Sequence, residues 1–397
     1  MTRVFADRMN KLGTETAFEV LAKAKALEKQ GRDIVHLEIG EPDFDTPSNI
    51  KEAAVKAMQS GYTHYVPAAG IPELRQAIAE YLSKSRGIPV DPDEVVVTPG
   101  AKPIIFFSIL ALVEPGDEVM YPNPGFPIYE SMVNFVGAKP VPMPLKEEND
   151  FSIDDEDTAA KITKKTKLII LNSPENPTGG VLSKGNLENI ADRIKNRDDV
   201  FVLTDEVYSQ IIYEGRHQSI ASLPDMKEKT ILLDGFSKTY AMTGWRLGYA
   251  AMQKDLAQKV TQLMINSNSC TTAFNQMAGV EALHGSQTEP KKMVEEFRKR
   301  REVIVSGLNK IKGITCKKPH GAFYVFPNIK SFGMESKELA DLILQNAGVA
   351  VLSGTAFGAY GEGYLRLSFA NSVPNIEKAI KRISDTVKEL KPQARAA

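Results

Sequence analysis

The middle of the chain alternates short runs of β-branched and other apolar residues with longer segments of helical pattern. Four of these runs lead directly into polar or glycine-rich turns: Val95–Thr98, Lys167–Asn172, Val200–Thr204 and Thr230–Leu233. Because the runs are apolar without interruption, they indicate strands that are buried on both faces. Buried strands separated by helices predict an α/β fold with a mainly parallel sheet.

The last third of the chain has a different pattern, typical of a smaller α+β unit. We predict strands over Ala322–Phe326 and Gly363–Phe369, each followed by a helix, the first over Ser336–Ala347. A chain of 397 residues exceeds what one small core needs, so we expect two domains. The large α/β domain is predicted over residues 46–287, and the smaller one over 1–45 and 288–397, including a helix near Thr14–Gln30.

Charge and composition exclude several classes of function. The chain has 49 Lys and Arg against 50 Asp and Glu, and this balance gives no attraction for nucleic acid or an acidic membrane. The longest apolar run, Ile104–Val113, is far shorter than the ~20 residues that span a bilayer. The N-terminus has no signal-peptide core, and two cysteines suit a reducing compartment. We therefore expect a cytoplasmic protein without nucleic-acid or membrane partners.

The turns after the four strands carry most of the unusual polar residues. In an open parallel sheet, ligands bind beyond the carboxyl ends of the strands, so four such turns predict one composite site. The segments concerned are Pro99–Lys102, Asn172–Gly179, Asp205–Tyr208 and Gly235–Arg246.

Lys238 is the most informative residue of these turns. It follows the apolar run Thr230–Leu233 and stands in a polar, tightly turning segment with Gly235, Ser237 and Arg246. An amine held in this way is a candidate nucleophile for a carbonyl group, with which it forms a Schiff base. An ordinary solvated lysine in a loop is the simpler alternative.

Gly100, Ala101 and Lys102 open a predicted helix, and Pro103 stands in its first turn. A helix N-terminus that glycine leaves open binds anions, most often phosphate, and Arg246 could add a bidentate contact. A plain helix cap explains the same residues. The five histidines have no zinc-ligand spacing, so we predict no metal site.

Asp205 stands at the end of a buried strand, where an ionised carboxylate requires a cationic partner. The protonated nitrogen of a pyridine ring would serve, although a helix-capping aspartate is equally compatible. Tyr208 and Asn176 offer hydrogen bonds to a phenolate oxygen, but turn chemistry or core packing explains each of them alone.

The run Lys238–Gly248 resembles the cofactor-attachment signature of class I/II aminotransferases of pyridoxal 5'-phosphate (PLP) fold type I, and the likeness extends nearly end to end. From Gly40 onward the chain is most similar to the bacterial and archaeal aspartate aminotransferase-like subgroup. The resemblance implies PLP as the cofactor and Lys238 as its Schiff-base lysine, which also moves the proton. It implies that Asp205 binds the pyridinium nitrogen, and that Asn176 and Tyr208 bind the phenolic oxygen.

The same resemblance implies the remaining contacts. Gly235 stands where many members have serine, so Ser237 is expected to supply that hydroxyl. Tyr65 is expected to reach the phosphate of a neighbouring subunit, which implies a homodimer with shared sites. The other implied contacts are Phe126 on the ring, Arg246 with the amides of Ala101 and Lys102 on the phosphate, and Arg366 with Gly40 and Asn176 on the substrate α-carboxylate.

The resemblance also bears on the substrate. The similar subgroup uses a lysine at the position of Lys102, with nearby hydroxyl groups such as that of Thr16, to bind a distal carboxylate. This favours an aspartate- or glutamate-type donor and 2-oxoglutarate as acceptor in a ping-pong reaction. A surface lysine at a helix start is the alternative for Lys102, and Glu15 would repel a second carboxylate or attract a basic group. Aromatic- or alanine-type transamination and a C–S β-lyase reaction stay open.

Overall fold

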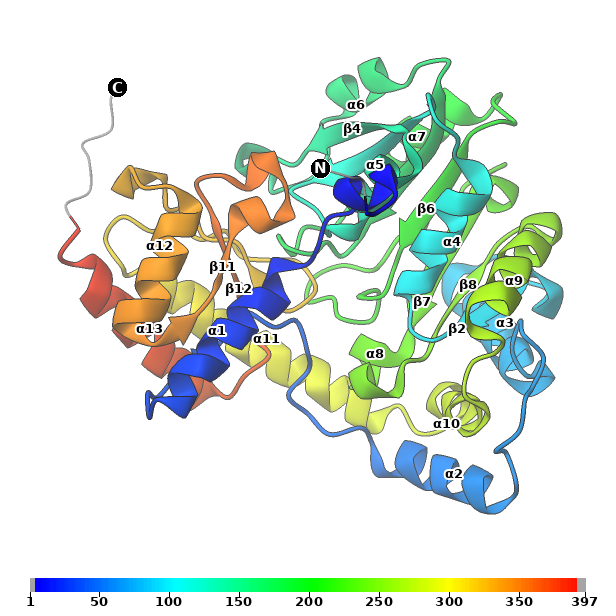
Figure 1. Ribbon diagram of the computed structural model, residues 1–397, viewed down its shortest axis with the longest axis horizontal. Helices are drawn as coiled ribbons and strands as arrows, with labels where there is room; N and C mark the ends of the chain where they lie inside the picture. Colours follow the sequence, from blue (N-terminus) through cyan, green and yellow to red (C-terminus); the bar gives the residue numbers. More distant parts are fainter. Residues whose placement is uncertain (1–3, 391–397) are drawn as a thin grey trace.

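The computed structural model describes residues 4–390, and its centre is a seven-stranded sheet (Figure 1). The strand order is β2-β8-β7-β6-β5-β3-β4, and within this sheet β8 alone runs antiparallel to its neighbours. This architecture confirms the predicted α/β fold with a mainly parallel sheet. The strands are β2 (Val95–Thr98), β3 (Glu118–Asn123), β4 (Lys139–Pro144), β5 (Thr166–Asn172), β6 (Phe201–Asp205), β7 (Thr230–Gly235) and β8 (Gly248–Ala251).

Helices cover both faces of this sheet, as the uninterrupted apolar strands require. Successive residues of one strand serve opposite faces: Val96 packs with Ile104 and Val260, whereas Val95 packs with Leu74 and Ala278. The first face is covered by α4 (Lys102–Leu112), α5 (Ile128–Val136) and α9 (Lys254–Asn268). The second is covered by α2 (Ser48–Gln59), α3 (Pro72–Arg86), α7 (Lys184–Ile194) and α10 (Ala273–His284), with α6 (Asp155–Lys161) beside α7.

A smaller region contains most of the C-terminal third. Its core includes Phe297 of the long helix α11, together with Phe323 and Phe369. The sheet elements are β9 (Tyr324–Val325), β11 (Leu352–Ser353) and β12 (Leu365–Ser368), and β1 (Val35–His36) pairs with β10 (Val349–Ala350). The helices are α1 (Thr16–Lys29), α11 (Thr288–Leu308), α12 (Ser336–Leu342), which continues as a π-helical turn over Ile343–Ala347, and α13 (Val373–Val387).

The two strands predicted in this region are shorter than expected. The first spans only β9, because Ala322 has a left-handed φ of +55° and Pro327 cannot donate a backbone hydrogen bond. The second spans only β12. Both strands nevertheless pair with each other, so their positions were predicted correctly.

The N-terminal segment links the two regions. The 3-10 helix η1 (Asp7–Lys11) lies against α5, and the Gly13 amide donates to Ser131 Oγ at 2.8 Å. The chain then enters α1, which packs on the smaller region. The proposed division into residues 46–287 and the two flanking segments stays a prediction. Among residues 4–390, no helix is both long and apolar enough to cross a membrane.

Candidate active site

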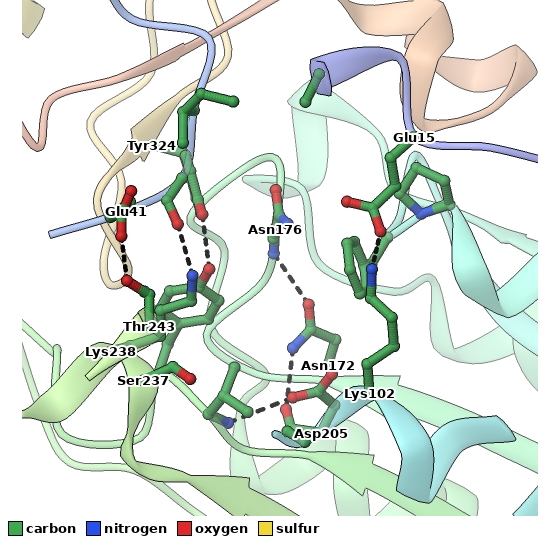
Figure 2. A pocket seen from close by; sticks show the side chains of 18 of the residues that line it. Glu15, Glu41, Lys102, Asn172, Asn176, Asp205, Ser237, Lys238, Thr243 and Tyr324 are labelled. Atoms are coloured by element: carbon green, nitrogen blue, oxygen red, sulfur yellow. Dashed lines mark hydrogen bonds and ion pairs between the residues drawn. The ribbon is translucent and has the colours of Figure 1, made fainter. Parts of the chain in front are cut away.

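A cavity of about 500 Å³ lies at the carboxyl ends of β2, β5, β6 and β7 (Figure 2). These four ends share one edge because β8 is antiparallel to both β2 and β7, which makes β2 parallel to the other three. All four predicted loops contribute to the lining. The predicted site residues in it are Thr16, Gly40, Ala101, Lys102, Phe126, Asn176, Asp205, Tyr208, Ser237, Lys238, Arg246 and Arg366.

Two predicted site residues lie outside this lining. Gly100 stands just behind Ala101, where an added Cβ atom would lie 2.2 Å from Arg246 Nη2. Tyr65 is 89% exposed, on the stretch between α2 and α3. The described chain therefore leaves the Tyr65 side chain available for a contact outside its own cavity.

Lys238 stands on the short helix α8 (Phe236–Thr239), which begins directly after β7. Its Nζ donates to the Gly40 carbonyl at 2.5 Å, and it lies 6.0 Å from the ring centroid of Tyr208. Burial of the ammonium group lowers the pKa of Lys238 to about 8. The neutral amine, which is the nucleophilic form, is therefore accessible near neutral pH.

Asp205 is the last residue of β6 and is buried. Its Oδ2 accepts from the Tyr129 hydroxyl at 2.8 Å, and its Oδ1 accepts from the Val207 amide at 3.3 Å. Both donors are neutral, and burial raises the pKa of Asp205 to about 6. A cationic ring nitrogen in the cavity would match this carboxylate.

Two tyrosine hydroxyl groups and one asparagine also belong to the lining of the cavity. The Tyr208 and Tyr324 hydroxyls form a hydrogen bond of 2.6 Å, and both side chains are buried. The Asn176 amide N–H donates to Asn172 Oδ1 at 3.0 Å, which fixes the loop after β5 (Figure 2). The first contact orients the Tyr208 side chain, and the Asn176 side chain is oriented by Arg366, whose Nη1 donates to Asn176 Oδ1 at 3.4 Å. Neither side chain uses all of its hydrogen-bonding capacity in these contacts.

The first turn of α4 forms an open cradle. Gly100 has φ +86°, and an added Cβ atom at Gly248 would lie 2.3 Å from the Ala101 nitrogen. Glycine at both positions lets β8 and Arg246 approach the helix N-terminus closely. The first N–H groups of a helix have no partner within it, so this turn suits an anion beside the Arg246 guanidinium.

Arg366, on β12, is a buried cation with an incomplete set of partners. Its Nη2 donates to the Glu38 carbonyl, and its guanidinium carbon lies 4.6 Å from the Tyr324 ring centroid. Among the described residues, its Nε has no hydrogen-bond partner. Burial of the guanidinium group lowers the pKa of Arg366, although attraction to Tyr324 and Glu38 opposes this effect. A carboxylate ligand in the cavity would supply the missing partner.

Lys102 points into the cavity from the start of α4, but its ammonium group already has a partner. It forms an ion pair with Glu15, and its Nζ lies 5.2 Å from the ring centroid of Phe126. The structure therefore places the Lys102 side chain in the lining of the cavity, and its role in substrate binding stays a prediction. Its charge, however, is matched within the chain.

Comparison with known proteins identifies the family. The model for aminotransferase class I and II matches residues 32–383. The chain belongs to this family. It is therefore a PLP-dependent aminotransferase, an enzyme whose substrates are amino acids and 2-oxo acids.

Relatives of this aminotransferase cover nearly its whole length. An aspartate aminotransferase of Pyrococcus abyssi is 44% identical over 91% of this chain and 93% of its own. An aromatic-amino-acid aminotransferase of Thermococcus litoralis is 42% identical over 90% of this chain and 92% of its own. The solved structure of the Thermus thermophilus aspartate aminotransferase with maleate has a TM-score of 0.93 and 37% identity, covering 97% of this chain and 100% of that one.

The residues of the cavity fit the cofactor of this aminotransferase. The neutral partners of Asp205 suit a cationic ring nitrogen, and the glycine-lined helix start suits a phosphate, whereas the open Arg366 Nε is left for a carboxylate ligand. Three features were missed from the sequence: Tyr129, Tyr324 and the pairing of Lys102 with Glu15. Tyr129 stands three residues after Phe126, and helical spacing was the one signal that pointed to it.

Proposed function

We propose that this aminotransferase transfers the amino group of a dicarboxylic donor of the aspartate type to 2-oxoglutarate by a ping-pong mechanism, which forms glutamate, and that glutamate is the donor in the reverse direction. The observation that carries the proposal is the presence of two cations for a substrate in one cavity, Arg366 and Lys102. A dicarboxylic amino acid has two carboxylates, and these side chains match them. Relatives that are named aspartate aminotransferases, at 44% and 42% identity, support the same substrate class.

We assign the contacts to the cofactor ring as follows. Bound PLP supplies an aldehyde for amines and an aromatic ring that delocalises electrons from the substrate Cα–H bond. Lys238 Nζ would hold the cofactor covalently, and the Asp205 carboxylate would bind its protonated ring nitrogen. Tyr129, which donates to Asp205 at 2.8 Å, would keep that carboxylate oriented. Tyr208 and Asn176 would bind the phenolic oxygen, and Phe126 would stack on the ring.

The phosphate would lie at the start of α4. The amides of Ala101 and Lys102 would donate to it, Arg246 would add a charged contact, and Ser237 would supply a hydroxyl. Gly100 and Gly248 support this assignment, because a side chain at either position would collide with the cradle itself.

Lys238 would also carry the proton of the reaction. Its pKa of about 8 makes the neutral amine available, and Nζ would accept the proton from the substrate Cα. Arg366 would hold the α-carboxylate at that point, assisted by Gly40 and Asn176. The Tyr324 ring and the Glu38 carbonyl support this role, because they fix the guanidinium plane.

Lys102 and Thr16 would bind the distal carboxylate of the substrate. Thr16 is the first residue of α1 and lines the cavity next to Glu15. An ammonium group with an adjacent hydroxyl provides a charged and a neutral donor for one carboxylate. This part of the site would distinguish dicarboxylic from neutral donors.

We further propose a cytoplasmic homodimer with shared sites. Tyr65 is 89% exposed although it is aromatic, and Ile265 is 55% exposed. In the assembled dimer, Tyr65 would reach the phosphate of the neighbouring chain. Both cysteines, Cys270 and Cys316, are unpaired, which suits a reducing compartment.

The proposal is tested by single-turnover reactions of the PLP form with a panel of amino acids. Aspartate and glutamate are expected to react fastest, and Lys102→Met is expected to lower their kcat/KM by about 10²-fold, since it removes a charged contact. Alanine is the matched substrate, because it has no distal carboxylate and should be affected little. Release of pyruvate and ammonia without an acceptor would show a β-lyase instead.

A further inference from the structure

Glu15 lies inside the substrate cavity although no part of the proposed reaction uses it. Its carboxylate forms an ion pair with Lys102, and the two side chains are 23% and 42% exposed (Figure 2). Glu15 comes from the start of α1 and Lys102 from the start of α4, so the pair joins the N-terminal segment to the wall of the cavity. The pair is therefore a contact between two separate elements.

The local structure at Glu15 indicates that this residue does not serve the helix. It occupies the N-cap position of α1, where Ser, Thr, Asp or Asn is usual, and its side chain makes no capping hydrogen bond. The preceding backbone is held independently, because the Gly13 amide donates to Ser131 Oγ at 2.8 Å. Rotation of the Glu15 side chain alone would therefore release Lys102 without unfolding the segment.

The pair changes what the cavity offers a substrate. With Glu15 in place, Lys102 is neutralised and lies over the Phe126 ring, and Ile105 and Phe18 add apolar lining nearby. A neutral or aromatic side chain would enter this part of the cavity without meeting an uncompensated charge. A dicarboxylic substrate would have to displace the Glu15 carboxylate from Lys102, and a partly exposed ion pair is weak enough to be displaced.

We propose that Glu15 is a specificity-determining residue, whose carboxylate takes the place on Lys102 that the distal carboxylate of a dicarboxylic substrate would occupy. This inference rests on the proposed function, in which Lys102 binds that carboxylate. Glu15 competes with dicarboxylates and admits neutral and aromatic donors to the same site. The enzyme thereby accepts both classes of amino acid at the cost of weaker binding of the dicarboxylic one.

The test uses the holoenzyme and the isosteric substitution Glu15→Gln, with kcat and KM measured for aspartate and for phenylalanine. We expect KM for aspartate to fall about fivefold, because the competing charge is gone while the amide keeps the shape. KM for phenylalanine should rise severalfold, because Lys102 then lies unpaired in the cavity. Glu19→Gln is the matched control, since Glu19 is an exposed glutamate in the first turn of the same helix.

The double variant Glu15→Gln/Lys102→Met separates this inference from the proposed function. In the Lys102→Met background, Glu15→Gln can only remove direct repulsion of the aspartate carboxylate, so KM for aspartate should fall less than in the wild-type background. If Lys102→Met weakens aspartate binding but Glu15→Gln leaves the aspartate-to-phenylalanine ratio of kcat/KM within about twofold of wild type, the inference on Glu15 is wrong and the function stands. If Lys102→Met does not weaken aspartate binding, the proposed function itself is wrong, and with it the role of Glu15.

Discussion

Two clusters of buried charge lie at the ends of β6 and β7, and they are built in opposite ways. Asp205 and Lys238 belong to the cavity and have few hydrogen-bond partners, and each of those partners is a neutral group. The adjacent Glu206 belongs to a second cluster with Arg86 and Asp234, in which each charge has several partners. Charges in the first cluster need a ligand of opposite charge as a partner, whereas charges in the second cluster are paired with other side chains of the protein.

The second cluster illustrates the complete case. Arg86 Nε donates to Glu206 at 2.7 Å, and its Nη2 donates to Asp234 at 3.1 Å and to Ser209 at 2.9 Å. Glu206 also accepts from Ser219 at 2.6 Å. Burial raises the pKa of Glu206, but attraction to His217 and Arg86 outweighs it and lowers the pKa to about 2. A buried charge that is this well matched has no capacity left for a substrate.

The largest expected effect is the loss of activity in Lys238→Met. Removing the amine removes both the covalent attachment of the cofactor and the proton carrier, so kcat should fall by about 10⁴-fold or more. The apoprotein should be at least as stable as wild type in urea unfolding, because a partly buried cation with one hydrogen bond is replaced by an apolar chain of similar volume. Lys259→Gln, an exposed lysine of α9, serves as the control and should retain activity.

A large loss of stability in Lys238→Met would contradict this distinction between the two clusters. It would mean that the Lys238 amine is a structural charge of the same kind as Arg86, and that its single bond to Gly40 holds the two regions together.

The reverse pattern is expected for Arg86→Met. This substitution leaves Asp234 buried without its cation and Glu206 with His217 alone, so the free energy of unfolding should fall by about 3–5 kcal/mol in urea titrations. The fraction that stays folded at low temperature should keep kcat within about tenfold of wild type, because Arg86 does not line the cavity. Wild-type stability with lost activity would show that the cluster acts in catalysis instead.

The same contrast explains what could be predicted from the sequence. The strand-end loops carry Asp205, Asn176 and Lys238 directly after recognisable apolar strands, so local pattern was enough to bring them together. The parallel orientation of the strands then placed the loops at one edge. The resemblance to a family supplied the roles, which remain proposals for each residue.

The features that were missed depend on contacts between distant elements. Tyr324 meets Tyr208 across 116 residues of sequence, and Arg86 meets Asp234 across 148. Glu15 was recognised as a charge near the substrate, but its pairing with Lys102 across 87 residues was not. Each of these residues has an ordinary local explanation, as a strand residue, the end of an amphipathic helix or a helix start. Only the tertiary packing shows that these residues also contribute to the cavity or to the second cluster.

A smaller effect, confined to substrate binding, is expected for Arg366→Lys. Lysine keeps the charge but loses the planar fork that binds a carboxylate bidentately, so KM for the amino donor should rise by about 10²-fold. Cofactor absorbance should be retained, because Arg366 is assigned to the substrate and not to PLP. Unchanged KM would show that the open Nε is satisfied in another way and that the cavity charge is structural.

The smallest expected effect is the contribution of Lys238 to the pH dependence of stability. Its pKa is about 8 in the folded apoprotein and about 10.5 in the unfolded chain, so between these values the unfolded chain binds a proton that the folded chain lacks. The Lys238 contribution to the free energy of unfolding should therefore rise with pH through this window, by about 1–2 kcal/mol after allowance for partial exposure, and be lost as the pH falls back to 8. Burial raises the pKa of Cys316 to about 12, and this group contributes a change of opposite sign, so the Lys238 contribution is the difference between wild type and Lys238→Met. Urea unfolding of the apoprotein at pH 7.5 and pH 10 measures this rise. Lys238→Met should lack it, whereas Arg86 stays charged throughout this range and contributes no such slope. An equal rise in Lys238→Met would assign the titration to another group and remove the physical basis for an accessible neutral amine.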